Sequence, residues 1–98
     1  MTTKTAQFTP GPWYPHLAKA DHCLSSSVWG AEPGNQVAVI GGKSLQTMNA
    51  NATLIAAAPA MYEALQATLA YFLRSRQSHA PEVRAIQTAL AQAEGRQG

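Results

Sequence analysis

The sequence has little cysteine, few acidic residues and little charge of either sign. With one cysteine in 98 residues, Cys23, the chain has neither an internal disulfide nor a paired-cysteine metal motif. Five acidic residues against seven Lys and Arg give a net charge of +2. Because the basic residues are scattered, this balance does not indicate nucleic-acid binding. The chain is nevertheless 46% hydrophobic, which is too apolar for a disordered protein.

Targeting and membrane segments are also missing. Residues 1–7 lack the apolar run of a signal peptide. The uncharged stretch 44–62 is long enough to suggest a membrane span, but polar residues dilute it and Pro59 interrupts it. The sequence therefore predicts a cytoplasmic protein that forms one small domain over residues 1–98, with residues 1–8 and 95–98 flexible.

Glycine distribution separates two halves of different character. Residues 8–43 contain both tryptophans and most of the glycines, whereas residues 44–94 contain no glycine and are rich in alanine and leucine. Strands followed by helices are typical of an α+β fold rather than of alternating βαβ units. We therefore expect a three-stranded antiparallel meander followed by two to three helices packed on one face.

Three segments have the pattern of short strands: residues 13–18, 23–29 and 36–40. The last is the strongest, because it is rich in β-branched residues. Between the second and third lies Glu32-Pro33-Gly34-Asn35, with proline and glycine where a type II turn favours them, which predicts an antiparallel hairpin. Residues 19–22 are the predicted connection between the first two strands.

The second half predicts helices. Ser44 or Thr47 can cap the first, and its apolar residues recur at helical spacing. Pro59 either kinks this helix or begins a new one, whose apolar stripe continues to Leu73. A last helix is expected to begin near Ser78 with a serine cap and an early proline, and to end at Gly95. The residues expected to be buried on the first and last helices are Leu45, Met48, Ala52 and Ile55, and Val83, Ile86 and Leu90.

The segment from Ser44 to Tyr62 carries no charge and many alanines. A small domain cannot bury such a helix on every side, and small side chains permit another helix to approach closely. The segment therefore predicts self-association, most simply a two-fold dimer. The alternative is a polar but uncharged surface helix.

Four consecutive residues invite a phosphate-loop interpretation: Gly41, Gly42, Lys43 and Ser44. The nucleotide-binding motif also needs a glycine five positions before its Gly-Lys pair, where this chain has Val37. What remains is a glycine turn with a cation at a predicted helix N-terminus, which can bind an anion. The alternative is an ordinary strand-to-helix turn.

Trp13, Tyr14 and Trp29 offer the largest contact area. Trp13, which follows two prolines, is the expected core residue, and the others can stack on a flat ligand or on a partner. Asn49 and Asn51 lie within a predicted helix, where asparagine gains nothing from propensity. Each is either solvated or recruited to a hydrogen bond across an interface or with a ligand.

Signals for metal binding and catalysis are weak. The histidines at positions 16, 22 and 79 do not have metal-ligand spacing, so we expect no metal and no cofactor. Cys23 in a strand is typical of a small buried residue. Asp21 and Glu32 are the only carboxylates among the first sixty residues. The sequence therefore does not predict an enzyme.

Two motifs resemble a set of small uncharacterised proteins encoded by bacteriophages and prophages. They are Thr9-Pro10-Gly11-Pro12-Trp13 and the segment ANATLIAAAP at residues 50–59. The resemblance covers about residues 8–73. Relatives often have Glu-Leu-Leu after the proline, where this chain has Ala60-Met61-Tyr62. The resemblance implies an accessory phage protein in the host bacterial cytoplasm and transfers no catalytic residue.

These observations give a first hypothesis of a counter-defence homo-oligomer that sequesters a nucleotide-like immune signal in pockets between subunits. Trp13, Tyr14 or Trp29 would stack on a base, residues 41–44 would hold phosphate, and Asn51 would contact polar edges. The second hypothesis is a protein-binding inhibitor of a host defence complex, similar to anti-CRISPR proteins. The third is a small enzyme that degrades such a signal.

Overall fold

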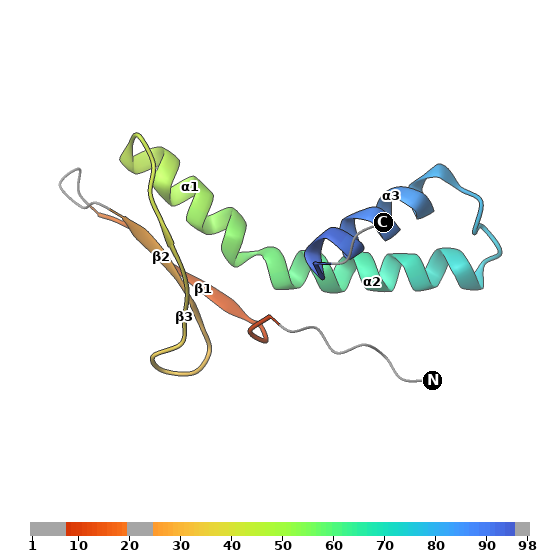
Figure 1. The fold of residues 1–98 in the computed structure, drawn as a ribbon, viewed down its shortest axis with the longest axis horizontal. Coiled ribbons are helices and arrows are strands. Elements are labelled where there is room, and N and C mark those ends of the chain that lie inside the picture. Colours follow the sequence, from red (N-terminus) through yellow and green to blue (C-terminus); the bar gives the residue numbers. More distant parts are fainter. Residues whose placement is uncertain (1–7, 20–24, 96–98) are drawn as a thin grey trace. The chain divides into compact units, whose positions relative to one another are not determined.

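A computed structural model describes residues 8–19 and 25–95. They form three strands, β1 (Trp13–His16), β2 (Ser26–Gly30) and β3 (Gln36–Ile40), and three helices, α1 (Leu45–Ala56), α2 (Ala58–Arg74) and α3 (Pro81–Ala93) (Figure 1). The chain divides into two compact units. Thr9–Ala60 is called the sheet unit here, and the residues from Met61 onward, with Phe8, are called the helical unit. The predicted α+β arrangement is confirmed.

The strands form one antiparallel sheet in the order β1-β2-β3, as the hairpin pattern predicts. At the β2–β3 turn, Gly34 has a φ of +78° and the Asn35 N–H donates to the Glu32 carbonyl at 3.2 Å. A positive φ at this position is what the predicted type II turn requires of glycine. Strand β3 has its predicted bounds, whereas β1 ends at His16 and β2 begins at Ser26. The predicted 19–22 connection and Cys23 fall largely outside the described residues.

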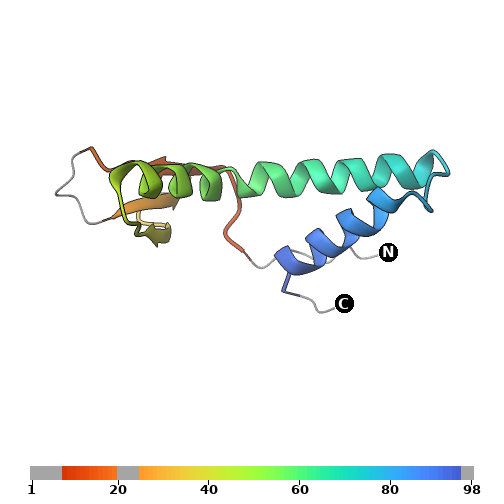
Figure 2. The same ribbon diagram turned by 90° about the horizontal axis from the view of Figure 1, so that it is seen from above.

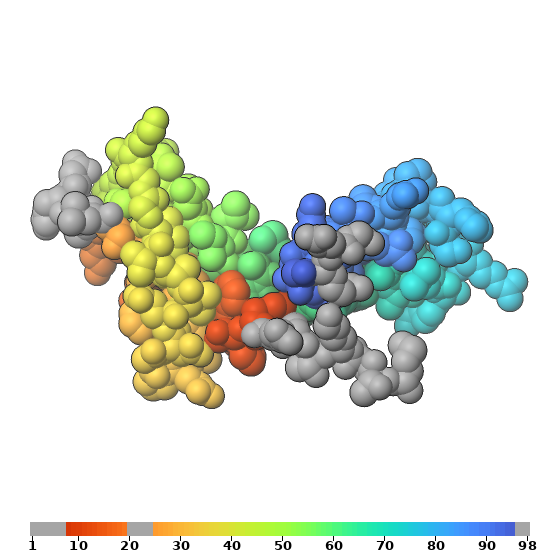
Figure 3. Space-filling model, in the orientation of Figure 1, coloured from red at the N-terminus to blue at the C-terminus, as the bar shows by residue number. Residues whose placement is uncertain are grey.

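Strand β3 lies at an edge of the sheet. In the space-filling view, the segment around β3 (yellow) runs across the near side of the sheet unit with no other segment over it (Figure 3). Its five residues, QVAVI, include neither a charge nor a proline. Edge strands usually carry charged residues or prolines, which prevent pairing with a further chain, and β3 has neither.

Helix α1 packs against one face of the sheet (Figure 2). Of the two candidate caps, Ser44 is the N-cap, and its hydroxyl accepts from the Thr47 N–H at 3.1 Å. The predicted apolar face is confirmed, since Met48 and Ala52 are buried and Leu45 and Ile55 are half-buried. Side chains from the sheet and from α1 form the core of this unit: Val28, Ile40 and Ala52, with Trp13, Val37, Ala38, Ile55 and Ala56 packed against them.

Asn49 joins α1 to the sheet unit's backbone by hydrogen bonds. Its side-chain carbonyl accepts from the Ala18 N–H at 2.9 Å and from the Ser26 hydroxyl at 2.7 Å. Its amide group donates to the Ala18 carbonyl at 2.9 Å. Ser26 is only 2% exposed, so Asn49 satisfies a buried hydroxyl. Asn49 is therefore hydrogen-bonded within its own chain, a role that is neither of the two predicted for it.

Pro59 marks the start of a new helix rather than a kink in a continuous one. Helix α1 ends at Ala56, and α2 begins at Ala58 after one intervening residue. Proline is tolerated at this point, because the first N–H groups of a helix have no partner within it. Pro59 is buried, and a Cβ added to Gly11 would lie 2.7 Å from the Pro59 Cβ.

In the helical unit, α3 buries the three residues expected of it, Val83, Ile86 and Leu90. The α2 stripe is half-buried at Tyr62, Leu65, Leu69 and Phe72, whereas Met61 and Leu73 are 44% and 48% exposed. The Tyr62 hydroxyl donates to a Glu94 carboxylate oxygen, and the Phe8 ring meets the Tyr62 ring edge-on.

The start and end of α3 give one wrong and one confirmed prediction. The predicted serine cap is wrong, since the N-cap is Ala80 and makes no side-chain hydrogen bond. Proline is tolerated only in the first turn of a helix, so α3 begins at Pro81 and its N-cap is the residue immediately before it. Ser78 lies two residues before that N-cap and cannot cap the helix. Gly95, with a φ of +76°, follows the end of α3 as expected.

Arg76 occupies the position where a helix end favours glycine. Its φ is +62°, and the next residue, Gln77, donates its N–H to the Phe72 carbonyl at 2.9 Å, which is typical of a Schellman motif. A left-handed conformation costs a non-glycine residue about 1–2 kcal/mol. We expect Arg76→Gly to stabilise the protein by about 1 kcal/mol in thermal unfolding followed by circular dichroism. Arg74→Gly, within the helix, should be destabilising, and an equal effect of the two variants would contradict this interpretation.

Candidate functional site

The sheet face opposite α1, called the outer face, gathers aromatic side chains. Tyr14 pairs with Trp29, and His16 pairs with Ser27, across β1 and β2. Directly opposite residues project from the same face, so these four side chains share it. Val39 extends the row onto β3, because it pairs with Ser27. Tyr14 and Val39 are 50% and 61% exposed, so large apolar groups face solvent here.

Trp29 is held in a defined orientation on this face. Its indole N–H donates to the Ser27 hydroxyl at 2.8 Å. The His16 ring lies 5.7 Å from the Trp29 ring, centroid to centroid, with the planes inclined at 40°. Tyr14, on the same strand as His16, lies directly across from Trp29. The outer face therefore presents Tyr14, His16 and Trp29 as a half-exposed aromatic platform.

Trp13 does not belong to this platform. It pairs with Gly30 and packs against the Val28 core on the α1 side of the sheet. Its indole N–H donates to the Thr9 carbonyl at 3.0 Å. The prediction that Trp13 is a core residue is thus confirmed. Adjacent residues of a strand project to opposite faces, so Tyr14 and Trp13 cannot contact one ligand from one face.

Residues 41–44 connect β3 to α1. The Ser44 hydroxyl caps α1 and also donates to the Thr47 hydroxyl at 3.0 Å. Gly42 packs closely, since an added Cβ would lie 2.8 Å from the Met48 side chain and 3.0 Å from its backbone nitrogen. Gly41 has open space around it, and Lys43 is exposed. Close packing thus explains Gly42 without a ligand, while Lys43 remains available to an anion.

Asn51 is exposed on α1, whereas Asn49 on the same helix is hydrogen-bonded as described above. Because α1 covers the inner face, the structure does not bring Asn51 together with Tyr14 and Trp29. Sequence reasoning also missed His16 as a member of the site. The alternation of residues 14 and 16 along a strand was the signal that could have found it.

The part of the chain that the structure describes contains no cluster of potential metal ligands. Over residues 8–19 and 25–95, no three His, Cys, Asp or Glu side chains come close enough together to hold a metal ion. The chemical capacity of the outer face is therefore stacking and hydrogen bonding.

Residues 1–97 match the family described as Salmonella phage P22 protein Y8K6. The chain belongs to this family. No curated protein and no solved structure matches the chain significantly.

The phage resemblance is thereby confirmed at the level of a phage protein family. In the described residues of this family member, no helix is long and apolar enough to cross a membrane.

Proposed function

We propose that this member of a phage protein family is a counter-defence protein that binds and sequesters a nucleotide-like signalling molecule of the host. The observation that carries the proposal is the pairing of Tyr14 with Trp29 on the outer face, beside His16. Aromatic side chains on an open sheet are the usual stacking surface for bases, and each stacked base contributes about 1–3 kcal/mol.

The phosphate-binding part of this proposal uses the turn after β3. Val39 lies in the same cross-strand row as Ser27 and His16, and Gly41 follows two residues later. At about 3.3 Å per residue, the turn begins roughly 7 Å beyond that row and roughly 16 Å beyond Gln36, the partner of Trp29. Only an extended ligand, such as a dinucleotide, can therefore stack on Trp29 and reach Lys43 with a phosphate. The proposed ligand contacts therefore include His16 and no longer include Asn51 and Trp13.

Self-association is the second part of the proposal. Opposite its buried face, α1 exposes Thr47, Ala50 and Leu54, and Leu54 is 62% exposed. We infer that a second copy packs on this uncharged face. Because the aromatic platform is on the other side of the sheet, each copy would bind its own ligand on an outward-facing platform. The expected stoichiometry is one ligand per chain rather than one per subunit boundary.

Titration of intrinsic fluorescence tests the stacking step. With cyclic dinucleotides and ADP-ribose derivatives as probes, we expect at least one to quench Trp29 and to saturate at one equivalent. Tyr14→Ala should weaken that probe about 10-fold, since it removes one stacking partner. Tyr71→Ala is the matched control, because Tyr71 is a similarly exposed tyrosine, at 57%, in the helical unit.

Recovery of the ligand separates sequestration from degradation. A sequestered probe is released intact when the protein is denatured, whereas an enzyme would convert it at substoichiometric protein concentrations. If the folded protein binds no probe of the panel, or if both tyrosine variants weaken binding equally, the platform does not have the proposed role.

A second candidate function is that of a protein-binding inhibitor of a host defence complex. The exposed Val39 favours it, because it adds apolar area beside the aromatic residues, and aromatic residues dominate the binding energy of protein interfaces. A host protein that copurifies with the wild type and is lost with Val39→Glu, while nucleotide binding is absent, would support this alternative.

A further inference from the structure

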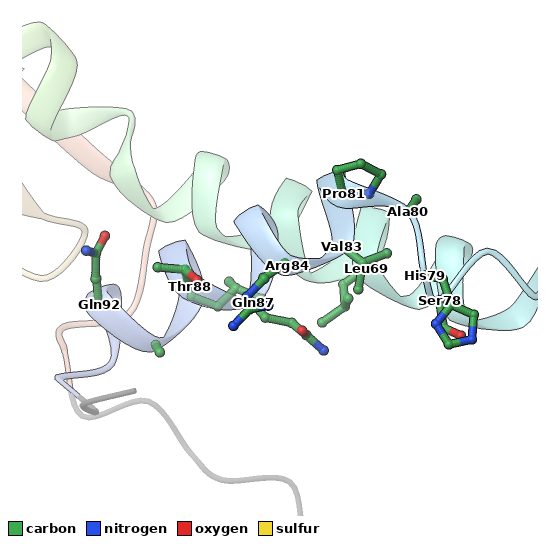
Figure 4. Close-up of a pocket in the computed structure, with 12 residues that line it drawn as sticks. Leu69, Ser78, His79, Ala80, Pro81, Val83, Arg84, Gln87, Thr88 and Gln92 are labelled. Carbon is green, nitrogen blue, oxygen red and sulfur yellow. The ribbon is translucent and has the colours of Figure 1, made fainter.

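The helical unit contains an open groove that no part of the proposed function uses. It runs along one side of α3 beside α2 and has a volume of about 1300 Å³ (Figure 4). Its accessible apolar surface comes mainly from the half-buried Leu69 of α2, because the apolar lining residues of α3, Val83, Leu90 and Ala91, are at most 9% exposed. Arg84 lines the same groove, and Gln87 and Thr88 follow it one turn later along α3.

The described polar side chains that line this groove are Arg84, His79 and four amides or hydroxyls, Ser78, Gln87, Thr88 and Gln92. Arg84 carries a permanent charge with several N–H donors, and His79 stands at the end of the groove next to Ser78. Among the described residues that line it, none has a carboxylate. Of the nearby acids, Glu94 is hydrogen-bonded to Tyr62, and Glu82 is two residues before Arg84 and thus on another side of α3. The groove therefore favours an anion.

The apolar and basic groups lie on the same side of α3. Arg84 is three residues before Gln87 and four before Thr88, and Ala91 is four and three residues after them, which places all four on one face of the helix. A ligand that contacts Ala91 and Leu69 with an apolar part can therefore reach the Arg84 guanidinium with a charged end. Guanidinium groups bind carboxylates and phosphates with two parallel hydrogen bonds.

From this combination we propose that the α2–α3 groove binds an amphipathic organic anion, with its acidic group on Arg84 and its apolar body against Leu69 and Ala91. The site is separate from the aromatic platform of the sheet unit and is independent of the function proposed for it. Gln87 and Thr88 supply additional hydrogen bonds to the acidic group.

Amide NMR spectra of the full chain test this proposal, with phenylacetate as the probe. Phenylacetate should cause saturable shifts at Gln87, Thr88 and Ala91, and Arg84→Gln should weaken its binding about five-fold, as expected for loss of a solvent-exposed charged hydrogen bond. Phenylacetamide, the neutral analogue, should bind the wild type as weakly as phenylacetate binds this variant. Phenyl phosphate should shift the same signals if the site accepts anions generally.

The matched control is Arg76→Gln, which removes the same charge from the turn before α3 without touching the groove lining. It should leave phenylacetate binding unchanged. Equal weakening by Arg84→Gln and Arg76→Gln, equal binding of acid and amide, or shifts confined to the sheet unit would each overturn the proposal. Arg84 is exposed, so its substitution is not expected to unfold the protein.

Discussion

Asn49→Ala is expected to destabilise the sheet unit by about 2 kcal/mol, because it leaves one buried and one half-buried group without a partner and an unsatisfied buried polar group costs about 1–3 kcal/mol. The Ser26 hydroxyl, 2.7 Å from the lost carbonyl oxygen, loses its acceptor in a nearly inaccessible position. The Ala18 carbonyl loses its donor at 2.9 Å. The better helix propensity of alanine offsets only about 0.5 kcal/mol.

Urea unfolding followed by tryptophan fluorescence measures this effect, since both tryptophans lie in the sheet unit. Asn51→Ala is the matched control, because it makes the same change two residues away at an exposed position of the same helix. It should be neutral or slightly stabilising. Similar losses for both variants would mean that the hydrogen bonds of Asn49 do not hold α1 to the sheet.

Leu54→Glu is expected to convert the proposed α1 dimer to a monomer. A leucine that is 62% exposed contributes little to the fold of one copy, but in the proposed α1 interface it would be buried against its symmetry mate. Two buried glutamates facing each other would weaken association by several kcal/mol, or at least 100-fold.

Sedimentation equilibrium at micromolar concentration should give twice the 10.4 kDa chain mass for the wild type and the chain mass for Leu54→Glu. Leu73→Glu serves as control, because it introduces the same charge at another exposed leucine, in the helical unit. It should remain dimeric. A wild-type protein that sediments at the mass of one chain would contradict self-association through residues 44–62.

Predictions from local signals are reliable where one residue type decides the conformation. Pro33 and Gly34 predicted the β2–β3 turn, Ser44 the start of α1, and Gly95 the end of α3. The predicted serine cap of α3 is wrong, because Pro81, and not the serine three residues before it, determines where the helix begins. Arg76 could not have been predicted, because a left-handed arginine has no local sequence signature.

The candidate site was only partly predictable. Alternation along strands placed Trp29 and Ser27 on one face and Val28 and Ser26 on the other, as the structure has them. Strand register then decided that Tyr14 and Trp29 meet, and register depends on pairing between segments distant in sequence. The rotation of α1 about its axis turns Asn49 towards Ala18 and leaves Asn51 exposed. Two asparagines separated by one residue do not determine this rotation.

The division of the chain at residue 60 has a consequence for synthesis. The N-terminal part of a chain leaves the ribosome first. All three strands, α1 and the residues that form the Asn49 hydrogen bonds lie before residue 60. The sheet, its core residues and its aromatic platform are thus all synthesised while α3 is still inside the exit tunnel, so translation itself delivers the two parts in order.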